Sequence, residues 1–294
     1  MKPVAFDYLR PDTVDEVLSV LAENAADAVL LAGGMSLGPM LNMRLVRPSV
    51  LIDLNRIKDL DEIRVTDDGI ITGATTRQAD ILKSRVIAEQ VPLLTRAMRY
   101  VGHFQTRTRG TVGGSVAHAD PSAEIPLVLV TLGGKIELAS QKNQRRWVAA
   151  SEFFCGVLTT DRRPDEMLVA LHWPRLAPET GYAFEEVAQR PGDLAIAAVA
   201  CAVKVGSNGK IAELRLGLGG VEDRPFRLDT SAVIGEPADE PTARALSDQA
   251  FETVNPIEDM TAGADYRLAL VRTLAFEAVG KAFAEAAGKA KKDG

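Results

Sequence analysis

Apolar residues near the start of the chain repeat first with a helical period and then in short runs. Positions from Val14 to Leu21 recur at helical spacing, and Thr13 followed by Glu16 forms a capping box, so a helix is predicted there. The apolar runs Ala28–Ala32 and Val50–Ile52 are typical of buried strands. The pattern therefore predicts a helix and two buried strands within the first 53 residues.

The pattern changes again in the following segments. Residues 63–72 alternate around the turn Asp67-Asp68-Gly69, which predicts a β-hairpin. A helical stretch runs from about residue 76 to 100, with an interruption near Pro92. The remaining predicted elements are a helix over 122–132, strands over 135–139 and 167–173, a hairpin over 194–218 with its turn at 207–209, and helices over 241–253 and 263–287. The composition shifts around residues 174–178, where we expect a domain boundary.

Composition excludes several classes of protein. The 294 residues carry a formal net charge of −6 and only 5% are aromatic, which does not suit a nucleic-acid binder. Two cysteines cannot supply the four thiolates of an iron–sulfur cluster, and the three histidines are too scattered for a metal site. With no apolar signal sequence and no uncharged 18-residue stretch, we expect a cytoplasmic protein without a transmembrane segment.

A double glycine, Gly33-Gly34, directly follows the first apolar run. Glycines at this point let the chain turn sharply and let a ligand approach the backbone with no Cβ in the way. Successive N–H groups in such a turn form a concave surface for phosphate oxygens, to which Ser36 can add a hydroxyl. The segment has neither the Gly-Lys-Ser/Thr of a Walker loop nor the three glycines of the dinucleotide fingerprint. A tight turn with only a structural role is the alternative interpretation.

A second double glycine, Gly113-Gly114, lies between Thr111 and Ser115, again in a strand-like context. Two such loops together can hold the two phosphates of one diphosphate, since each charge-assisted amide hydrogen bond contributes roughly 1.5–3 kcal/mol. Neither loop contains a basic residue, which favours recognition by the backbone. Glu124 can accept hydrogen bonds from a ribose or ribityl hydroxyl, or can instead face the dipole at the start of a helix.

These motifs resemble those of the FAD-binding medium subunit of the molybdenum hydroxylases, the family of carbon monoxide dehydrogenase and xanthine dehydrogenase. Residues 32–37, Ala-Gly-Gly-Met-Ser-Leu, match its first flavin motif, A-G-G-x-S-L, and residues 111–115, Thr-Val-Gly-Gly-Ser, match its second, T-[IV]-G-G-S. Segments 51–57, 117–121 and 190–195 are also similar, so the resemblance covers nearly the whole chain.

The resemblance implies an α+β protein. Residues 1–176 would form a two-subdomain FAD-binding domain of the vanillyl-alcohol oxidase (PCMH) type, with subdomains of roughly 1–57 and 58–176. Residues 177–294 would form a smaller C-terminal domain of antiparallel sheet plus helices.

The resemblance also implies which residues bind FAD. The diphosphate and ribityl region would contact two sets of residues: Leu30, Leu31, Ala32, Gly33, Gly34, Met35, Ser36 and Leu37, and Thr111, Val112, Gly113, Gly114 and Ser115. Ala117 and Glu124 would contact the sugar and ribityl portion, and the walls of the isoalloxazine pocket would include Val101, Gly102, Leu168 and Leu194. Met35 stands where relatives commonly have Gln or His, and Leu194 stands where they can have an aromatic residue.

As a member of this family, the chain would be an oxidoreductase subunit without its own catalytic acid–base set or metal. It would pass electrons from iron–sulfur clusters in a small subunit, through FAD, to an external acceptor. A large subunit would carry the molybdenum cofactor and oxidise the substrate, such as carbon monoxide or an N-heteroaromatic compound, within a heterotrimer or a dimer of heterotrimers. The alternatives are a stand-alone FAD-dependent oxidoreductase on the same fold, and a scaffold in which the glycine loops are only turns.

Overall fold

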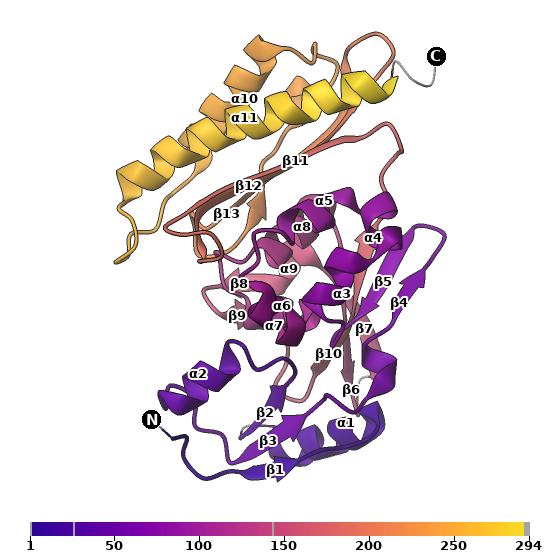
Figure 1. Cartoon of the computed structure of the whole chain (residues 1–294), viewed down its shortest axis with the longest axis vertical. Helices are drawn as coiled ribbons and strands as arrows, with labels where there is room; N and C mark the ends of the chain where they lie inside the picture. Colours follow the sequence, from indigo (N-terminus) through magenta and orange to yellow (C-terminus); the bar gives the residue numbers. More distant parts are fainter. Residues whose placement is uncertain (1, 26, 143, 291–294) are drawn as a thin grey trace.

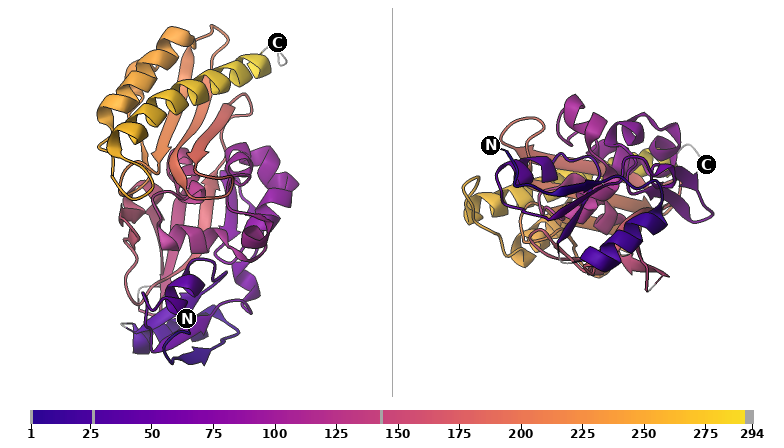
Figure 2. Two further views of the ribbon diagram at one scale, coloured as in Figure 1. Left: turned by 60° about the vertical axis from the view of Figure 1, so that its left-hand side comes forward. Right: turned by 90° about the horizontal axis from the view of Figure 1, so that it is seen from below.

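The computed structural model describes residues 2–25, 27–142 and 144–290 and is elongated (Figure 1). Three layers follow one another along its long axis. Their order is broadly the order of the sequence, from the N-terminal to the C-terminal part. A three-stranded sheet lies at one end, a five-stranded sheet with many short helices lies in the middle, and a four-stranded sheet under two long helices lies at the other end. The left-hand view of Figure 2 shows the same succession from another side.

The N-terminal layer is a parallel sheet with the strand order β1-β3-β2. Its strands are β1 (Asp7–Leu9), β2 (Ala28–Leu31) and β3 (Val50–Asp53). The central strand β3 is buried, as its apolar run predicts. The expectation of burial is wrong for β2, whose residues are all half-buried, because this edge strand has only one neighbour in the sheet.

Helix α1 (Val14–Asn24) packs against this sheet through the apolar positions that predicted it. Its capping pattern is confirmed, since the Glu16 amide donates to Thr13 Oγ1 over 3.2 Å. A short helix, α2 (Leu37–Asn42), and a 3₁₀ turn, η1 (Lys58–Leu60), complete this end of the molecule. Their few residues carry too little periodicity to predict them.

The middle sheet has the order β4-β5-β10-β6-β7, so its central strand arrives late in the sequence and joins two hairpins. A buried side-chain hydrogen bond links this central strand to β5, since the indole Nε1 of Trp173 donates to Thr72 Oγ1 over 3.0 Å. The strands are β4 (Ile63–Val65), β5 (Gly69–Gly73), β6 (Lys135–Ser140), β7 (Gln144–Ala149) and β10 (Met167–Pro174).

Short helices pack on one face of this sheet and enclose the largest hydrophobic core. They are α3 (Gln78–Lys83), α4 (Arg85–Gln90), α5 (Pro92–Ala97), α6 (Phe104–Arg109), α7 (Val112–His118), α8 (Glu124–Leu132) and α9 (Ala150–Phe153). The stretch expected to be one interrupted helix is therefore three helices. Pro92 begins α5 rather than breaking it, because the first helical position needs no amide donor. A small two-stranded sheet pairs β8 (Phe154–Gly156) with β9 (Thr159–Thr160).

The third layer is an antiparallel sheet with the order β11-β12-β13-β14, and the hairpin predicted over 194–218 is confirmed as its centre. The strands are β11 (Gly181–Ala188), β12 (Ala195–Val205), β13 (Ile211–Gly219) and β14 (Phe226–Arg227). Helices α10 (Glu240–Thr253) and α11 (Ala264–Ala290) cover one face, following the short turn η2 (Ser231–Val233).

The last helix runs further than its pattern predicts. The predicted helix ends at residue 287, but Lys289 still lies in α11, where its Nζ donates to the Thr180 carbonyl over 2.7 Å and pairs with Glu285 at 2.9 Å. These two contacts stabilise the final turn. Residues 291–294, which follow this helix, lie outside the described residues.

Helix α8 connects the middle and third layers. All nine of its residues are buried, because it packs between the other short helices and strands β12 and β13. The main core includes Tyr182 and Phe184 from β11, so it continues across the boundary expected near residue 176. Among the described residues, no helix is long and apolar enough to cross a membrane.

Candidate functional site

The two glycine motifs, far apart in the sequence, lie against each other in the structure. A Cβ on Gly33 would be 2.3 Å from the carbonyl oxygen of Arg109, and one on Gly114 would be 3.9 Å from the Cβ of Ala32. The first distance is far shorter than any real Cβ contact, so Gly33 is needed for the two segments to approach this closely. The folded chain thus brings together the two segments that sequence reasoning assigned to one diphosphate.

The amides of the first motif donate no hydrogen bond to the described part of the protein. In the hydrogen bonds of the described residues, no amide from Gly33 to Ser36 is a donor, although Gly34 accepts from Gly38 over 2.8 Å. Gly34 has a φ of +72°, which makes the sharp turn between β2 and α2. Met35 and Ser36 are exposed. Consecutive unbonded amides at a partly exposed turn fit the anionic oxygens of a diphosphate.

The second motif is built differently from the expectation. It is not strand-like but forms the first turn of α7, where the Thr111 side chain accepts from the Gly114 amide over 3.0 Å. The Gly113 amide donates to the Ala74 carbonyl over 3.1 Å, so the amides of this glycine pair are already bonded within the protein. Thr111, three residues before Gly114, is the local signal for this helix start, because threonine is a favoured N-cap residue.

Gly113 has a packing role. A Cβ there would be 2.5 Å from the Ala74 oxygen, so the glycine lets α7 begin against β5 and β10. Val112 is buried under the motif, whereas Ser115 is half-buried and Ala117 exposed. The second motif therefore presents the side chains of Ser115 and Ala117 and the end of α7 rather than a row of free amides.

Two residues absent from the sequence-based site connect the motifs. Arg77 Nη1 donates to the Arg109 carbonyl. Arg77 Nη2 donates to Asn55 Oδ1 over 2.5 Å. Asn55 Nδ2 donates to the Ala32 carbonyl over 2.9 Å. No local pattern identifies this pair, because each residue acts through a partner in a distant segment.

Glu124 is the first residue of α8 and is 5% exposed. Burial, with the Asp120 carboxylate nearby, raises the pKa of Glu124 to about 7. On β11, burial and then the charge of Glu124 raise the pKa of Glu186 to about 8, and Glu186 Oε2 is a buried atom without a hydrogen-bond partner in the described structure. The two carboxyl groups are therefore neighbours that are only partly ionised at neutral pH.

Glu185, which precedes Glu186 in the sequence, points to the opposite face of β11. Its carboxylate pairs with Lys281 of α11 at 2.7 Å. Adjacent strand residues alternate between faces, which is why Glu185 and Glu186 do not form a dyad.

The residues proposed for the isoalloxazine walls are placed in different environments. Val101 is buried and Gly102 has a φ of +48°. The loop before β12 reaches this segment, because a Cβ on Gly192 would be 2.8 Å from the His103 ring. Leu194, in the same loop, is 57% exposed, whereas Leu168 is buried in the main core. The loop before β12 of the third layer thus meets the segment of the middle layer that contains Val101 and Gly102.

Comparison with known proteins agrees with this geometry. Residues 4–176 match the family model described as the FAD binding domain in molybdopterin dehydrogenase, and residues 182–282 match the CO dehydrogenase flavoprotein C-terminal domain. The chain belongs to the family of FAD-binding medium subunits of molybdenum hydroxylases.

Individual relatives of this family extend over almost the full chain. Caffeine dehydrogenase subunit beta from Pseudomonas sp. (strain CBB1) is 35% identical over 285 residues, which is 96% of each chain. A carbon monoxide dehydrogenase structure from Hydrogenophaga pseudoflava, lacking the Mo-pyranopterin moiety, superposes with a TM-score of 0.93 at 33% identity and covers 97% of this chain and 99% of its own. Quinoline 2-oxidoreductase from Pseudomonas putida 86 gives 0.92 at 35% identity, with the same coverage. The expected family, α+β fold and FAD cofactor are thereby confirmed.

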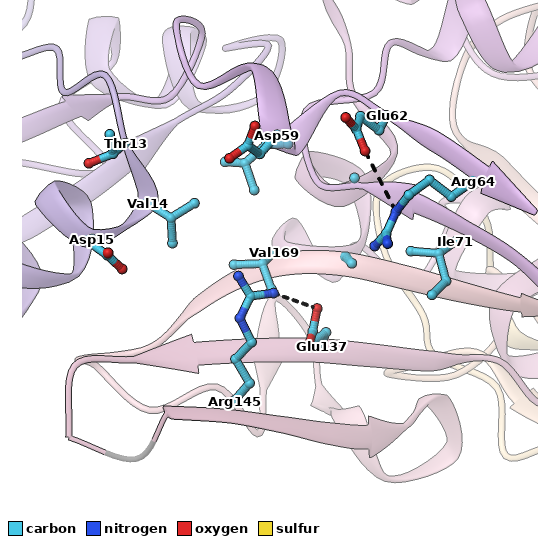
Figure 3. Close-up of a pocket in the computed structure, with 13 residues that line it drawn as sticks. Thr13, Val14, Asp15, Asp59, Glu62, Arg64, Ile71, Glu137, Arg145 and Val169 are labelled. Carbon is cyan, nitrogen blue, oxygen red and sulfur yellow. Dashed lines mark hydrogen bonds and ion pairs between the residues drawn. The ribbon is translucent and has the colours of Figure 1, made fainter. Parts of the chain in front are cut away.

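A cavity of about 330 Å³ lies elsewhere on this flavoprotein subunit. It opens between α1, η1 and the face of the middle sheet opposite the short helices (Figure 3). Ion pairs of Arg145 with Glu137 at 3.1 Å and Arg64 with Glu62 at 3.7 Å lie at its wall. None of the predicted FAD residues lines it. In the described part of the chain, no group of three or more His, Cys, Asp or Glu side chains is placed to hold a metal ion.

Proposed function

We propose that this flavoprotein subunit binds FAD with its diphosphate on the amides of residues 33–36, where the two glycine motifs meet. FAD, when bound, supplies the redox chemistry, and the protein contributes binding, orientation and electrostatics. The observation that carries the proposal is the run of amides in the first motif that donate to no protein acceptor in the described structure. Backbone donors of this kind recognise phosphate oxygens without a basic residue in the loop.

The remaining predicted contacts stay part of the proposal. Ser115, Ala117 and Glu124 would contact the ribityl and sugar portion, with the partly protonated carboxyl of Glu124 able to donate or accept a hydrogen bond. The isoalloxazine walls would be formed by Val101, Gly102, Leu168 and Leu194. The exposure of Leu194 supports a ligand-facing position, whereas the burial of Leu168 restricts it to an indirect role.

We also propose the assembly that the relatives' names suggest. Their names describe a subunit beta and a medium chain, so these relatives are parts of larger dehydrogenases. The chain here would receive electrons from iron–sulfur clusters of a small subunit, while a large subunit oxidises the substrate at its molybdenum cofactor. Substrates of the kind named for the relatives, carbon monoxide, caffeine and quinoline, would bind in that large subunit. The division into residues 1–176 and 177–294 and a cytoplasmic location belong to the same proposal.

Flavin absorbance of the purified chain, after addition of FAD, tests the proposal. The wild-type protein should retain FAD through gel filtration and show the two visible bands of an oxidised flavin. Gly34→Val should retain none, because its side chain covers the free amides. Gly209→Val is the matched control: its φ of +74° imposes the same backbone strain in the β12–β13 turn, where a Cβ meets no atom within 4 Å.

Two outcomes would contradict the proposal. The first is a colourless wild-type protein that also fails to bind added FAD. The second is equal loss of FAD in Gly34→Val and Gly209→Val, because the loss would then follow from backbone strain rather than from the first motif.

A further inference from the structure

A continuous chain of hydrogen bonds ties the first glycine motif to the second. It runs from the Ala32 carbonyl through the Asn55 amide side chain and the Arg77 guanidinium to the Arg109 carbonyl. Ala32 immediately precedes Gly33, and Arg109 is the residue whose carbonyl Gly33 nearly touches. The chain of bonds therefore spans the contact between the motifs that we propose for FAD binding.

Asn55 is itself held in place by Asp53. The Asp53 carboxylate accepts from the Asn55 amide over 2.8 Å and from Asn55 Nδ2 over 2.5 Å, and its other oxygen accepts from the Tyr8 hydroxyl. Although burial alone would raise the pKa of Asp53, these hydrogen bonds leave it below the ordinary value. An ionised Asp53 thus anchors the amide in one orientation, with its oxygen toward Arg77 and its nitrogen toward Ala32.

Arg77 and Arg109 form a pair of like charges beside the free amides. Burial, followed by the charge of Arg109, lowers the pKa of Arg77. Among the ion pairs of the described residues, neither guanidinium has a carboxylate partner. The carboxylates of Asp80, Asp53 and Asp61 act on the pKa of Arg77 in the opposite direction but do not cancel the lowering, so an anionic ligand close to this pair of cations would be favourable.

We infer that Arg77 and Asn55 are positioning residues that hold the two glycine motifs at the separation that FAD binding requires. The inference rests on the proposed function. Neither side chain needs to touch the cofactor: the pair fixes the Ala32 and Arg109 carbonyls, so that the amides of residues 33–36 point outward before the ligand arrives. Preorganisation of this kind contributes to affinity by removing the cost of ordering the loop upon binding.

The test is FAD affinity of the full chain, measured by quenching of flavin fluorescence on the FAD-depleted protein. The variants are Arg77→Gln, Asn55→Ala, the double variant, and Arg77→Lys, which keeps the charge but cannot bridge two acceptors in the same geometry. Arg85→Gln is the matched control, because Arg85 is 90% exposed on α4 and pairs only with Glu89, at 2.6 Å. Circular dichroism and thermal melting of each variant report whether it is folded.

Each single variant should bind FAD at least tenfold more weakly than wild type while staying folded, and Arg85→Gln should match wild type. The FAD affinity of the double variant should be at most about twofold below that of the single variant that binds FAD less tightly, because both substitutions break the same chain of bonds. Arg77→Lys should recover part of the loss. Partial recovery is not expected of a general packing defect.

Three results would overturn the inference: single variants within threefold of wild-type affinity, losses that multiply in the double variant, or full wild-type affinity in Arg77→Lys. If Arg77→Gln does not fold, Arg77→Lys and Asn55→Ala decide by the same criteria. Failure of the proposed function looks different, because in that case the wild-type chain itself does not bind FAD.

Discussion

Replacing Glu186 with glutamine removes one of two neighbouring, partly ionised carboxyl groups between β11 and α8. The side chains are nearly the same size, so packing is preserved. Glu186 Oε2 has no hydrogen-bond partner in the described structure, and the substitution therefore breaks no bond at that atom. The main physical change is the loss of a titrating group whose pKa rises from 4.5 to about 8 on folding.

The direction of the pH effect follows from that rise. The folded protein holds the proton more tightly than the unfolded chain, so ionisation of Glu186 lowers the free energy of unfolding as pH rises from about 4.5 to 8. Below this range both states are protonated and the contribution disappears. At about 1.4 kcal/mol per pKa unit the full effect would approach about 5 kcal/mol, and the partial exposure of the side chain reduces it to on the order of 2 kcal/mol.

Urea denaturation at pH 5 and pH 8 measures the effect. The difference in free energy of unfolding between Glu186→Gln and wild type should shift in favour of the variant by on the order of 2 kcal/mol between pH 5 and pH 8. Glu185→Gln is the control on the opposite face of β11. It loses the ion pair with Lys281 and should show no gain at high pH. Parallel stability curves for wild type and Glu186→Gln over this range would refute the reasoning.

Other substitutions test separate parts of the fold by thermal or chemical denaturation. Thr111→Ala removes the cap of α7 and should cost about 1 kcal/mol, with Thr106→Ala as a control that should change stability by less than about 0.5 kcal/mol; equal effects would contradict the capping role. Trp173→Phe removes the indole donor to Thr72 and should cost about 1–3 kcal/mol, since a buried hydroxyl loses its partner; an unchanged midpoint would contradict it. Leu94→Ala, at a fully buried site of α5, should cost about 2–5 kcal/mol, and a cost under about 1 kcal/mol would show that the core there collapses around the gap.

Several elements could be predicted from neighbouring residues alone. The capping box at Thr13, the hairpin turn around Asn208 and the two long C-terminal helices each depend on contacts within a few positions, so the pattern carries the needed information. The sharp turn at Gly34 belongs to this group, since its positive φ is a local requirement that glycine meets.

The predictions that were wrong depended on distant neighbours. An apolar run such as 28–31 looks the same in a central strand and in an edge strand, and only the strand order β1-β3-β2 makes β2 half-buried. The strand-like context expected for the second glycine pair is also wrong, because this pair lies in the first turn of α7. Its amides are instead used by the Ala74 carbonyl and the Thr111 hydroxyl, the first of which lies in another segment.

Local patterns and motif resemblance were therefore sufficient for the family, the cofactor and most helices and strands, because short-range periodicity and rare glycine spacings survive in the linear order of residues. The candidate site itself required long-range contacts. Gly33 against Arg109, Asn55 and Arg77 between the motifs, and Glu124 beside Glu186 each join segments more than 20 residues apart. Burial and charge at such contacts depend on what surrounds a side chain in space, and sequence position alone does not specify those surroundings.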